Sequence, residues 1–306
     1  MKPFYLALLV LAGTGSCLSA APQTVSGERT FATPEEAAKA LIEAAAKNDS
    51  AAMLKIFGPD GKDIVESGDP AAEKEGRAEF ARRAGEKMHI DVDAGNPDRA
   101  TLVVGQDEWP VPVPLIRTAG KWRFDAARGR VEILARRIGR NELSAIEVCR
   151  GYVEAQMEYA AHDRATDGML QYAQKIISSP GKKDGLYWEG EAQNLVPKAF
   201  ADAAAALLQA EGKKAVPYHG YFFHILKAQG PDAAVGAVDY VVKGKMIGGF
   251  ALIAWPAEYG VSGVKTFMVN HQGVVYSKDL GAATATAARQ TVRFNPDKTW
   301  KAEAAE

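Results

Sequence analysis

The sequence has few cysteines and almost no excess of charge. Of its 306 residues only Cys17 and Cys149 are cysteines, and the first lies in a predicted leader peptide. With one thiol left, the chain has no intramolecular disulfide, so a hydrophobic core must hold the fold. Cys149 lies on the apolar side of a helical pattern, which favours a small buried side chain over a nucleophile. The formal net charge of -1 disfavours a dedicated nucleic-acid binder.

Long apolar runs are also missing. The run from Phe4 to Gly15 is too short to span a bilayer, and the later runs have the length of strands, so no transmembrane segment is expected. Because Lys2 precedes this run and small residues follow it, we predict a signal peptide over 1–20 and an exported protein, periplasmic or secreted. Lipid anchoring at Cys17 is disfavoured because Thr14-Gly15-Ser16 lacks the branched apolar residue of that motif.

The usual signatures of catalysis and of metal or cofactor binding are absent. There is no C-x-x-C or H-E-x-x-H pair for zinc and no G-K-[ST] phosphate loop, so neither a metal nor a cofactor is expected. Ser179 and Lys182 have the S-x-x-K spacing of penicillin-binding proteins, but Pro180-Gly181 breaks the helical turn which that chemistry requires. These absences favour a non-catalytic protein over an enzyme.

The hydrophobic patterns predict an α+β protein. Residues 33–128 combine helical periods with strand periods, which indicates N-terminal helices on a curved antiparallel sheet. Residues 129–300 begin with a long helix or helical segment and end in strand patterns, which predicts packing on a second antiparallel sheet. Residues 21–32 and 301–306 are expected to form a flexible N-terminal segment and a tail.

Two details of the helical segment are also predicted. Gly139 and Gly151 weaken the pattern of one unbroken helix between Val131 and His162, because glycine is a poor helix former. A further helix is predicted over 167–179, ended by Pro180-Gly181.

The segment 181–190, GKKDGLYWEG, has two interpretations. In the favoured one, Asp184-Gly185 makes a tight turn and the triplet Leu186-Tyr187-Trp188 fills the joint between helices and sheet, because an exposed apolar cluster reduces solubility. In the other, aromatic residues with polar tips line a groove that binds an envelope protein or a glycan. The predicted groove contains Asp184, Tyr187, Trp188, Tyr218, Tyr221, Trp255, Tyr259 and His271.

Four separated motifs resemble those of a known family. They are RRIGRNE, SPGKKDGLYW, YHGYFFHILKAQGP and GKMIGGFALIAWPAEYGVSGVKTFMVNHQGVVYSKDLG. They resemble an exported bacterial family catalogued only as a domain of unknown function (the 2950 series). The resemblance implies a secreted or periplasmic bacterial protein, and it implies no activity and no functional residues. The N-terminal part, in its order of elements and its GKWRF ending, is similar to the curved-sheet cone of nuclear-transport-factor-2-like domains. The C-terminal strands are similar to those of pilin-like proteins.

Three functions are compatible with these features. The first, which we favour, is a non-catalytic binding or assembly module of the cell envelope. The second is an envelope hydrolase with an unfamiliar site near His219, His271 and Glu258. The third is a small-ligand carrier that uses the N-terminal cone, with Trp109 or Trp122 near the ligand.

Overall fold

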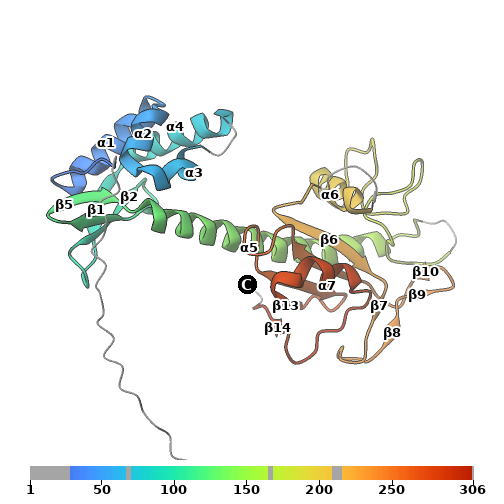
Figure 1. The fold of residues 1–306 in the computed structure, drawn as a ribbon. Helices are drawn as coiled ribbons and strands as arrows, with labels where there is room; N and C mark the ends of the chain where they lie inside the picture. The colour runs from blue at the N-terminus through green and yellow to red at the C-terminus, as the bar shows by residue number, and fades with distance from the viewer. Residues whose placement is uncertain (1–27, 67–69, 165–167, 209–215, 305–306) are drawn as a thin grey trace, which may run out of the picture. The chain divides into compact units, whose positions relative to one another are not determined.

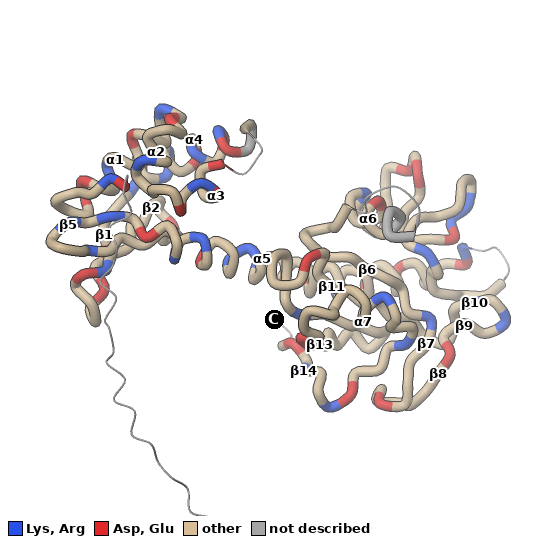
Figure 2. Tube along the Cα trace, in the orientation of Figure 1, with Lys and Arg blue, Asp and Glu red and all other residues tan. Residues whose placement is uncertain are grey.

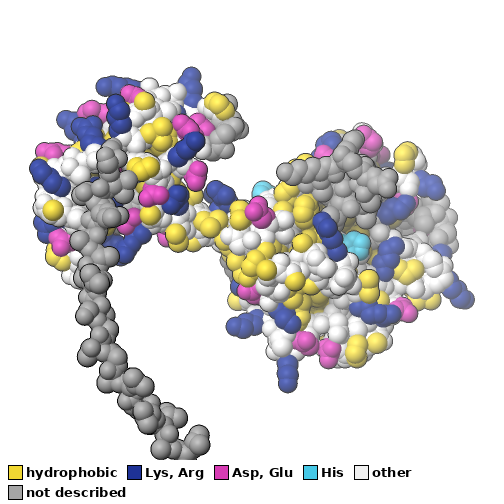
Figure 3. Space-filling view, in the orientation of Figure 1, with side chains coloured by type: hydrophobic (Ala, Val, Ile, Leu, Met, Phe, Trp, Pro, Cys, Tyr) yellow, Lys and Arg dark blue, Asp and Glu magenta, His cyan; other side chains and the backbone are white. Residues whose placement is uncertain are grey.

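The chain forms two compact units, Met1–Glu132 (unit 1) and Ile133–Glu306 (unit 2). The computed structural model describes residues 28–66, 70–164, 168–208 and 216–304, so the predicted signal peptide lies outside the described residues. Helices and antiparallel sheets occur in both units, which confirms the α+β class (Figure 1). Lys, Arg, Asp and Glu are spread over both units (Figures 2 and 3). No helix in the described part has the length and apolar character to cross a membrane.

Unit 1 contains several short helices and an antiparallel sheet. Its elements are α1 (Pro34–Ala46), α2 (Ser50–Phe57), η1 (Pro59–Gly61), α3 (Lys62–Val65), α4 (Pro70–Glu86), β1 (Met88–Val92), β2 (Arg99–Val104), β3 (Trp109–Pro110), β4 (Leu115–Thr118) and β5 (Lys121–Phe124). The strand order is β1-β2-β4-β5, with β3 paired to β2. Thr33 caps α1 as predicted, because its hydroxyl accepts a 3.2 Å hydrogen bond from the Glu36 backbone N–H.

The core of unit 1 includes one of the two tryptophans considered for a carrier site. Trp122 is buried with Phe124 and Phe57, whose rings meet edge to face at 5.4 Å. Trp109 is partly exposed, with the Arg83 guanidinium 5.6 Å from its ring centre. Phe31 exchanges two backbone hydrogen bonds with Trp122, at 2.8 and 2.9 Å. The described end of the segment predicted to be flexible is therefore tied to the sheet.

Unit 2 is built on a five-stranded antiparallel sheet. Its larger elements are α5 (Ala126–Ala160, beginning in unit 1), α6 (Lys198–Leu208), α7 (Thr284–Gln290), β6 (Tyr221–Leu226), β11 (Ala251–Pro256), β12 (Lys265–Asn270), β13 (Val275–Asp279) and β14 (Lys301–Ala302). Shorter elements are β7 (Ala228–Gln229), β8 (Val238–Asp239), β9 (Val241–Val242), β10 (Lys245–Met246) and η2 (Gly281–Ala283). The order β14-β13-β12-β11-β6 makes the start of the predicted tail an edge strand.

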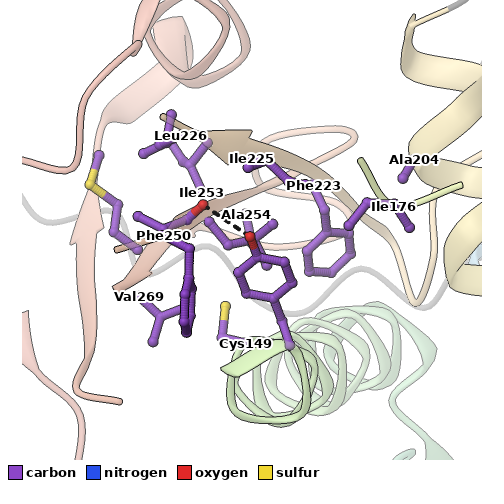
Figure 4. Packing of buried hydrophobic residues seen from close by; sticks show 14 of the residues in the cluster. Cys149, Ile176, Ala204, Phe223, Ile225, Leu226, Phe250, Ile253, Ala254 and Val269 are labelled. Carbon is purple, nitrogen blue, oxygen red and sulfur yellow. Dashed lines mark hydrogen bonds between the residues drawn. The ribbon is translucent and has the colours of Figure 1, made fainter. Parts of the chain in front are cut away.

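One face of α5 packs on this sheet. Cys149 is fully buried, as predicted, and points from α5 toward Phe250 and Val269 (Figure 4). The Tyr152 ring meets the Phe250 ring edge to face at 5.6 Å. The helix runs through Gly139 and Gly151 without interruption. Packing of the apolar face stabilises the helix enough to offset the low helix propensity of two glycines.

The helix predicted over 167–179 is wrong: the described residues of this segment, from 168 onward, form no helix. Tyr172 forms a β-bridge with Met246, and Ile177 forms one with Tyr187. The buried Gln156 side chain accepts a hydrogen bond from the Ala173 backbone N–H and donates one to its carbonyl, both at 2.8 Å. Tertiary partners thus satisfy the backbone groups that a helix would have paired internally.

Candidate functional site

The loop between Ser179 and Asp184 is folded around one carboxylate. Asp184 accepts hydrogen bonds from the Ser179 backbone N–H (2.7 Å), the Ser179 hydroxyl (3.0 Å) and the Lys175 ammonium (2.8 Å). Partial burial raises the pKa of Asp184, but these donors lower it by more, so its pKa lies below the ordinary value. The carboxylate therefore stays ionised and fixes the loop.

The triplet that follows faces mostly inward. Leu186 is 0% exposed and Trp188 is 7% exposed, whereas Tyr187 is half-buried against the core. The Trp188 indole N–H donates to the Gly185 carbonyl at 2.9 Å. A Cβ on Gly185 would lie 2.7 Å from the backbone nitrogen of Ser178, so the turn requires glycine. Leu186 and Trp188 thus fill the core, as the favoured interpretation expects.

Two cations cover the Trp188 ring. The Arg164 guanidinium carbon lies 4.7 Å from the ring centre, and the Lys183 ammonium lies 4.8 Å from it. Arg164 also donates from Nε to the Tyr159 carbonyl at 3.3 Å, while the Tyr159 hydroxyl donates to the Lys183 carbonyl at 2.7 Å. Trp188 therefore positions two positive groups at the surface.

These positive groups border a cavity of about 700 Å³, which we call the basic cleft. It is lined by Tyr159, Arg164, Gln171, Tyr172, Gln174, Lys175, Gly181, Lys182, Lys183, Asp184 and Lys227. Five of these side chains carry positive charge and one is a carboxylate. A concave surface with such an imbalance concentrates a positive potential and attracts anions. Its volume lies within the range of ordinary ligand sites.

The negative charges near the cleft compensate only part of this potential. Lys175 pairs with Asp184 at 2.8 Å, and Lys183 pairs with Glu191 at 3.1 Å. Lys182 and Lys227 have no carboxylate within ion-pair distance among the residues that the structure describes. The only polar contact of the Lys227 ammonium with a described residue is a long one, 3.4 Å, to the Gln174 amide oxygen. Positive charge therefore remains available at the cleft.

A second cavity of about 520 Å³ lies along α5. Glu147, Gly151, Glu154 and Glu158 border it from one face of the helix, since they recur at intervals of three or four residues. Its other side is formed by the segment 194–197 together with Phe200, Tyr218 and His219. Sequence reasoning missed these glutamates, although their helical spacing was visible.

The remaining residues of the predicted aromatic groove do not come together. Tyr221 and Trp255 are 0% and 1% exposed and belong to the core of unit 2. The Tyr221 hydroxyl donates to the Lys265 carbonyl at 2.9 Å. Tyr259 is exposed near Asp279, and Tyr218 lies in the second cavity. Of the predicted set, only Asp184 lines the basic cleft, and Trp188 supports it from beneath.

The histidines and the glutamate considered for a hydrolase do not converge either. His271 follows β12, and its backbone N–H donates to the Phe250 carbonyl, next to the start of β11. Glu258 and His219 lie beyond the other end of β11, where the Ala257 N–H donates to the Gly220 carbonyl. A strand of this length separates the two ends by roughly 17 Å. This arrangement leaves no shared site for the three side chains.

Burial lowers the pKa of His271, with a smaller opposing effect from its hydrogen bond to Phe250. In the described parts of the chain, no group of three or more His, Cys, Asp or Glu side chains is arranged to hold a metal ion.

Comparison with known proteins identifies one family. A family model described as "Protein of unknown function (DUF2950)" matches residues 28–302, which is most of the chain. Neither the curated proteins nor the solved structures contain a significant match.

Proposed function

Since the chain belongs to the DUF2950 family, whose description gives no activity, we propose from its structure that it is a non-catalytic binding module of the cell envelope. In this proposal the basic cleft recognises a negatively charged ligand. The observation that carries it is the set of five cations and a single carboxylate among the described residues around a cavity of about 700 Å³. The lack of convergence among His219, His271 and Glu258 favours binding over hydrolysis.

Fixed backbone around the cleft supports this proposal. The Tyr240 backbone N–H donates to the Lys227 carbonyl at 2.9 Å, and the Tyr159 hydroxyl holds the Lys183 carbonyl. Lys175 and the 179–184 loop are joined through Asp184. Because the backbone that carries these groups is already fixed, ligand binding has to order only their side chains, which favours affinity.

The envelope location rests on the leader-like sequence over 1–20. It is tested by fractionating cells that produce the full chain or a variant without residues 2–20. Export predicts that the full chain leaves the cytoplasm and that the shortened chain stays there. Equal distribution of the two chains would contradict the proposed location.

Ligand binding at the cleft is tested by photocrosslinking in cells. A photoreactive amino acid replaces Gln171, which lines the cleft. We expect an adduct in the wild-type background and its loss when Lys182→Glu and Lys227→Glu are combined, because reversed charges repel an anion. The matched control is Lys39→Glu with Lys55→Glu, two exposed lysines of unit 1. An adduct that survives the cleft variant, or disappears equally in the control, would contradict the proposed site.

A further inference from the structure

We propose that the ligand of the basic cleft is an acidic glycan, a chain of sugar units that carry carboxylates. The inference rests on the proposed function and adds the chemical class of the ligand. It follows from three properties of the described lining residues: they include no aliphatic side chain, their cations come from separate segments, and neutral polar groups lie between these cations.

Among the residues that the structure describes, those that line the cleft include no aliphatic side chain. They are charged residues, glutamines, tyrosines and one glycine. Protein and peptide partners are held mainly by apolar or aromatic anchors in desolvated pockets, and lipid chains need an apolar groove. The aromatic ring best suited to such an anchor, Trp188, is covered by Arg164 and Lys183. The cleft is therefore better suited to a ligand that is polar along its length.

The cations are distributed over separate segments. Arg164 follows α5, Lys175 precedes the loop, Lys182 and Lys183 lie within it, and Lys227 lies between β6 and β7. Four of the five are lysines, which act as point charges, whereas a compact phosphate is commonly held by the planar fork of arginine. Separate point charges around a wide cavity match carboxylates spaced along an extended chain.

Neutral polar groups occupy the space between these charges. Gln174 donates to the Gly244 carbonyl at 2.7 Å and faces Lys227 with its amide oxygen. The Gln171 amide makes no hydrogen bond to any residue that the structure describes, so it is free to bind a ligand. An amide both donates and accepts, as a sugar hydroxyl does. The combination of amides and ammonium groups fits sugar units that carry both hydroxyls and carboxylates.

The test measures binding of defined probes to the purified full chain by titration calorimetry at low salt. The probes are an oligogalacturonate, a neutral maltooligosaccharide of equal length, and an oligoglutamate of equal charge. We expect the oligogalacturonate to bind most tightly of the three probes. Its dissociation constant should rise about tenfold or more when Lys182→Glu and Lys227→Glu are combined. The control that combines Lys39→Glu and Lys55→Glu should bind like the wild type. Gln171→Ala should weaken the binding of the oligogalacturonate but not that of the oligoglutamate.

Equal binding of the oligoglutamate, or equal binding of the neutral oligosaccharide, would overturn the glycan inference. A folded wild-type chain that does not bind the oligogalacturonate would also overturn it. The crosslinking experiment separates this failure from that of the proposed function. If the cleft adduct still depends on Lys182 and Lys227, the binding module stands and only the ligand class is wrong. If the adduct is also absent, both are wrong.

Discussion

Asp184 and Ser179 are joined twice, because the Asp184 carboxylate accepts from both the backbone N–H and the hydroxyl of Ser179. These two bonds close the loop that carries Lys182 and Lys183. The same carboxylate also holds Lys175. One acidic residue thereby holds the Lys175 ammonium and orders the backbone that carries Lys182 and Lys183.

Asp184→Asn should separate the effect of this carboxylate on anion binding from its effect on the order of the loop. It removes the only negative charge among the described residues that line the cleft, so anion binding should tighten at low salt unless the loop loses its order. Because the side chain is partly exposed, we expect a loss of stability of about 1 kcal/mol or less. Titration calorimetry and urea unfolding measure the two quantities. Weaker binding by a variant of normal stability would mean that loop order dominates.

The contribution of Asp184 to stability also depends on pH. Its pKa is lower in the folded chain than the ordinary value, so the folded state favours the ionised carboxylate. The contribution is fully present above the pKa of the unfolded chain, about 4, and is lost as the pH falls through the folded pKa. The difference in unfolding free energy between wild type and Asp184→Asn should therefore be larger at pH 7 than at pH 3. An equal difference at both pH values would contradict this assignment.

Leu186→Ala tests the buried part of the triplet. The side chain is 0% exposed within the core of unit 2, so its truncation should cost about 2–5 kcal/mol of unfolding free energy. Tyr187→Ala, at the half-buried neighbour, should cost less. Urea unfolding of the two variants checks this order. Equal costs would show that burial alone does not set the contribution of each residue.

Gly185→Ala and Gly139→Ala should change the stability of the protein in opposite directions. A Cβ on Gly185 meets backbone atoms at 2.7–3.0 Å, and these atoms belong to the segment that pairs with Tyr187. A Cβ on Gly139 meets nothing within 4 Å. The first substitution should lower the melting temperature, and the second should stabilise α5 by about 0.5–1 kcal/mol. A shift in the same direction for both would contradict the geometry of the turn.

Gln156→Ala should loosen the segment after α5. The Gln156 side chain is buried and satisfies both backbone groups of Ala173. Leaving them unpaired should cost about 1–3 kcal/mol. Hydrogen exchange should quicken at Ala173 and its neighbours, while β11 keeps its protection. Unchanged exchange at Ala173 would mean that other contacts hold this segment.

Cys149 should be unreactive in the folded protein. Burial raises the pKa of its thiol to about 12, and the group is 0% exposed, so neither thiolate nor access is available at pH 8. In a Cys17→Ser chain, iodoacetamide should label Cys149 only in denaturant. Rapid labelling of the native chain would show that the helix and sheet separate at Cys149.

The sequence predicted the features that depend on local patterns. Thr33-Pro34 marks a helix start through capping alone, and an alternating segment such as Lys121–Phe124, which forms β5, favours a strand wherever the chain folds. The helix predicted over 167–179 failed because its partners, Gln156 and Met246, come from distant positions. A local propensity of a few tenths of a kcal/mol per residue is easily exceeded by such tertiary pairing.

The candidate site was only partly visible for the same reason. Lys182 and Lys183 were evident beside Asp184, but Arg164 and Lys227 join them only through the fold. The aromatic groove failed because aromatic residues in strands pack inward more often than they line a surface, as Tyr221 and Trp255 do.

The two cations that cover Trp188 make this indole a natural optical probe. Its fluorescence depends on the charges next to the ring, and both Arg164 and Lys183 also face the cleft. An anion that draws either group away from the ring would alter the emission of Trp188 without any added label. Comparison with a Trp188→Phe chain would isolate that signal from the other four tryptophans of the sequence.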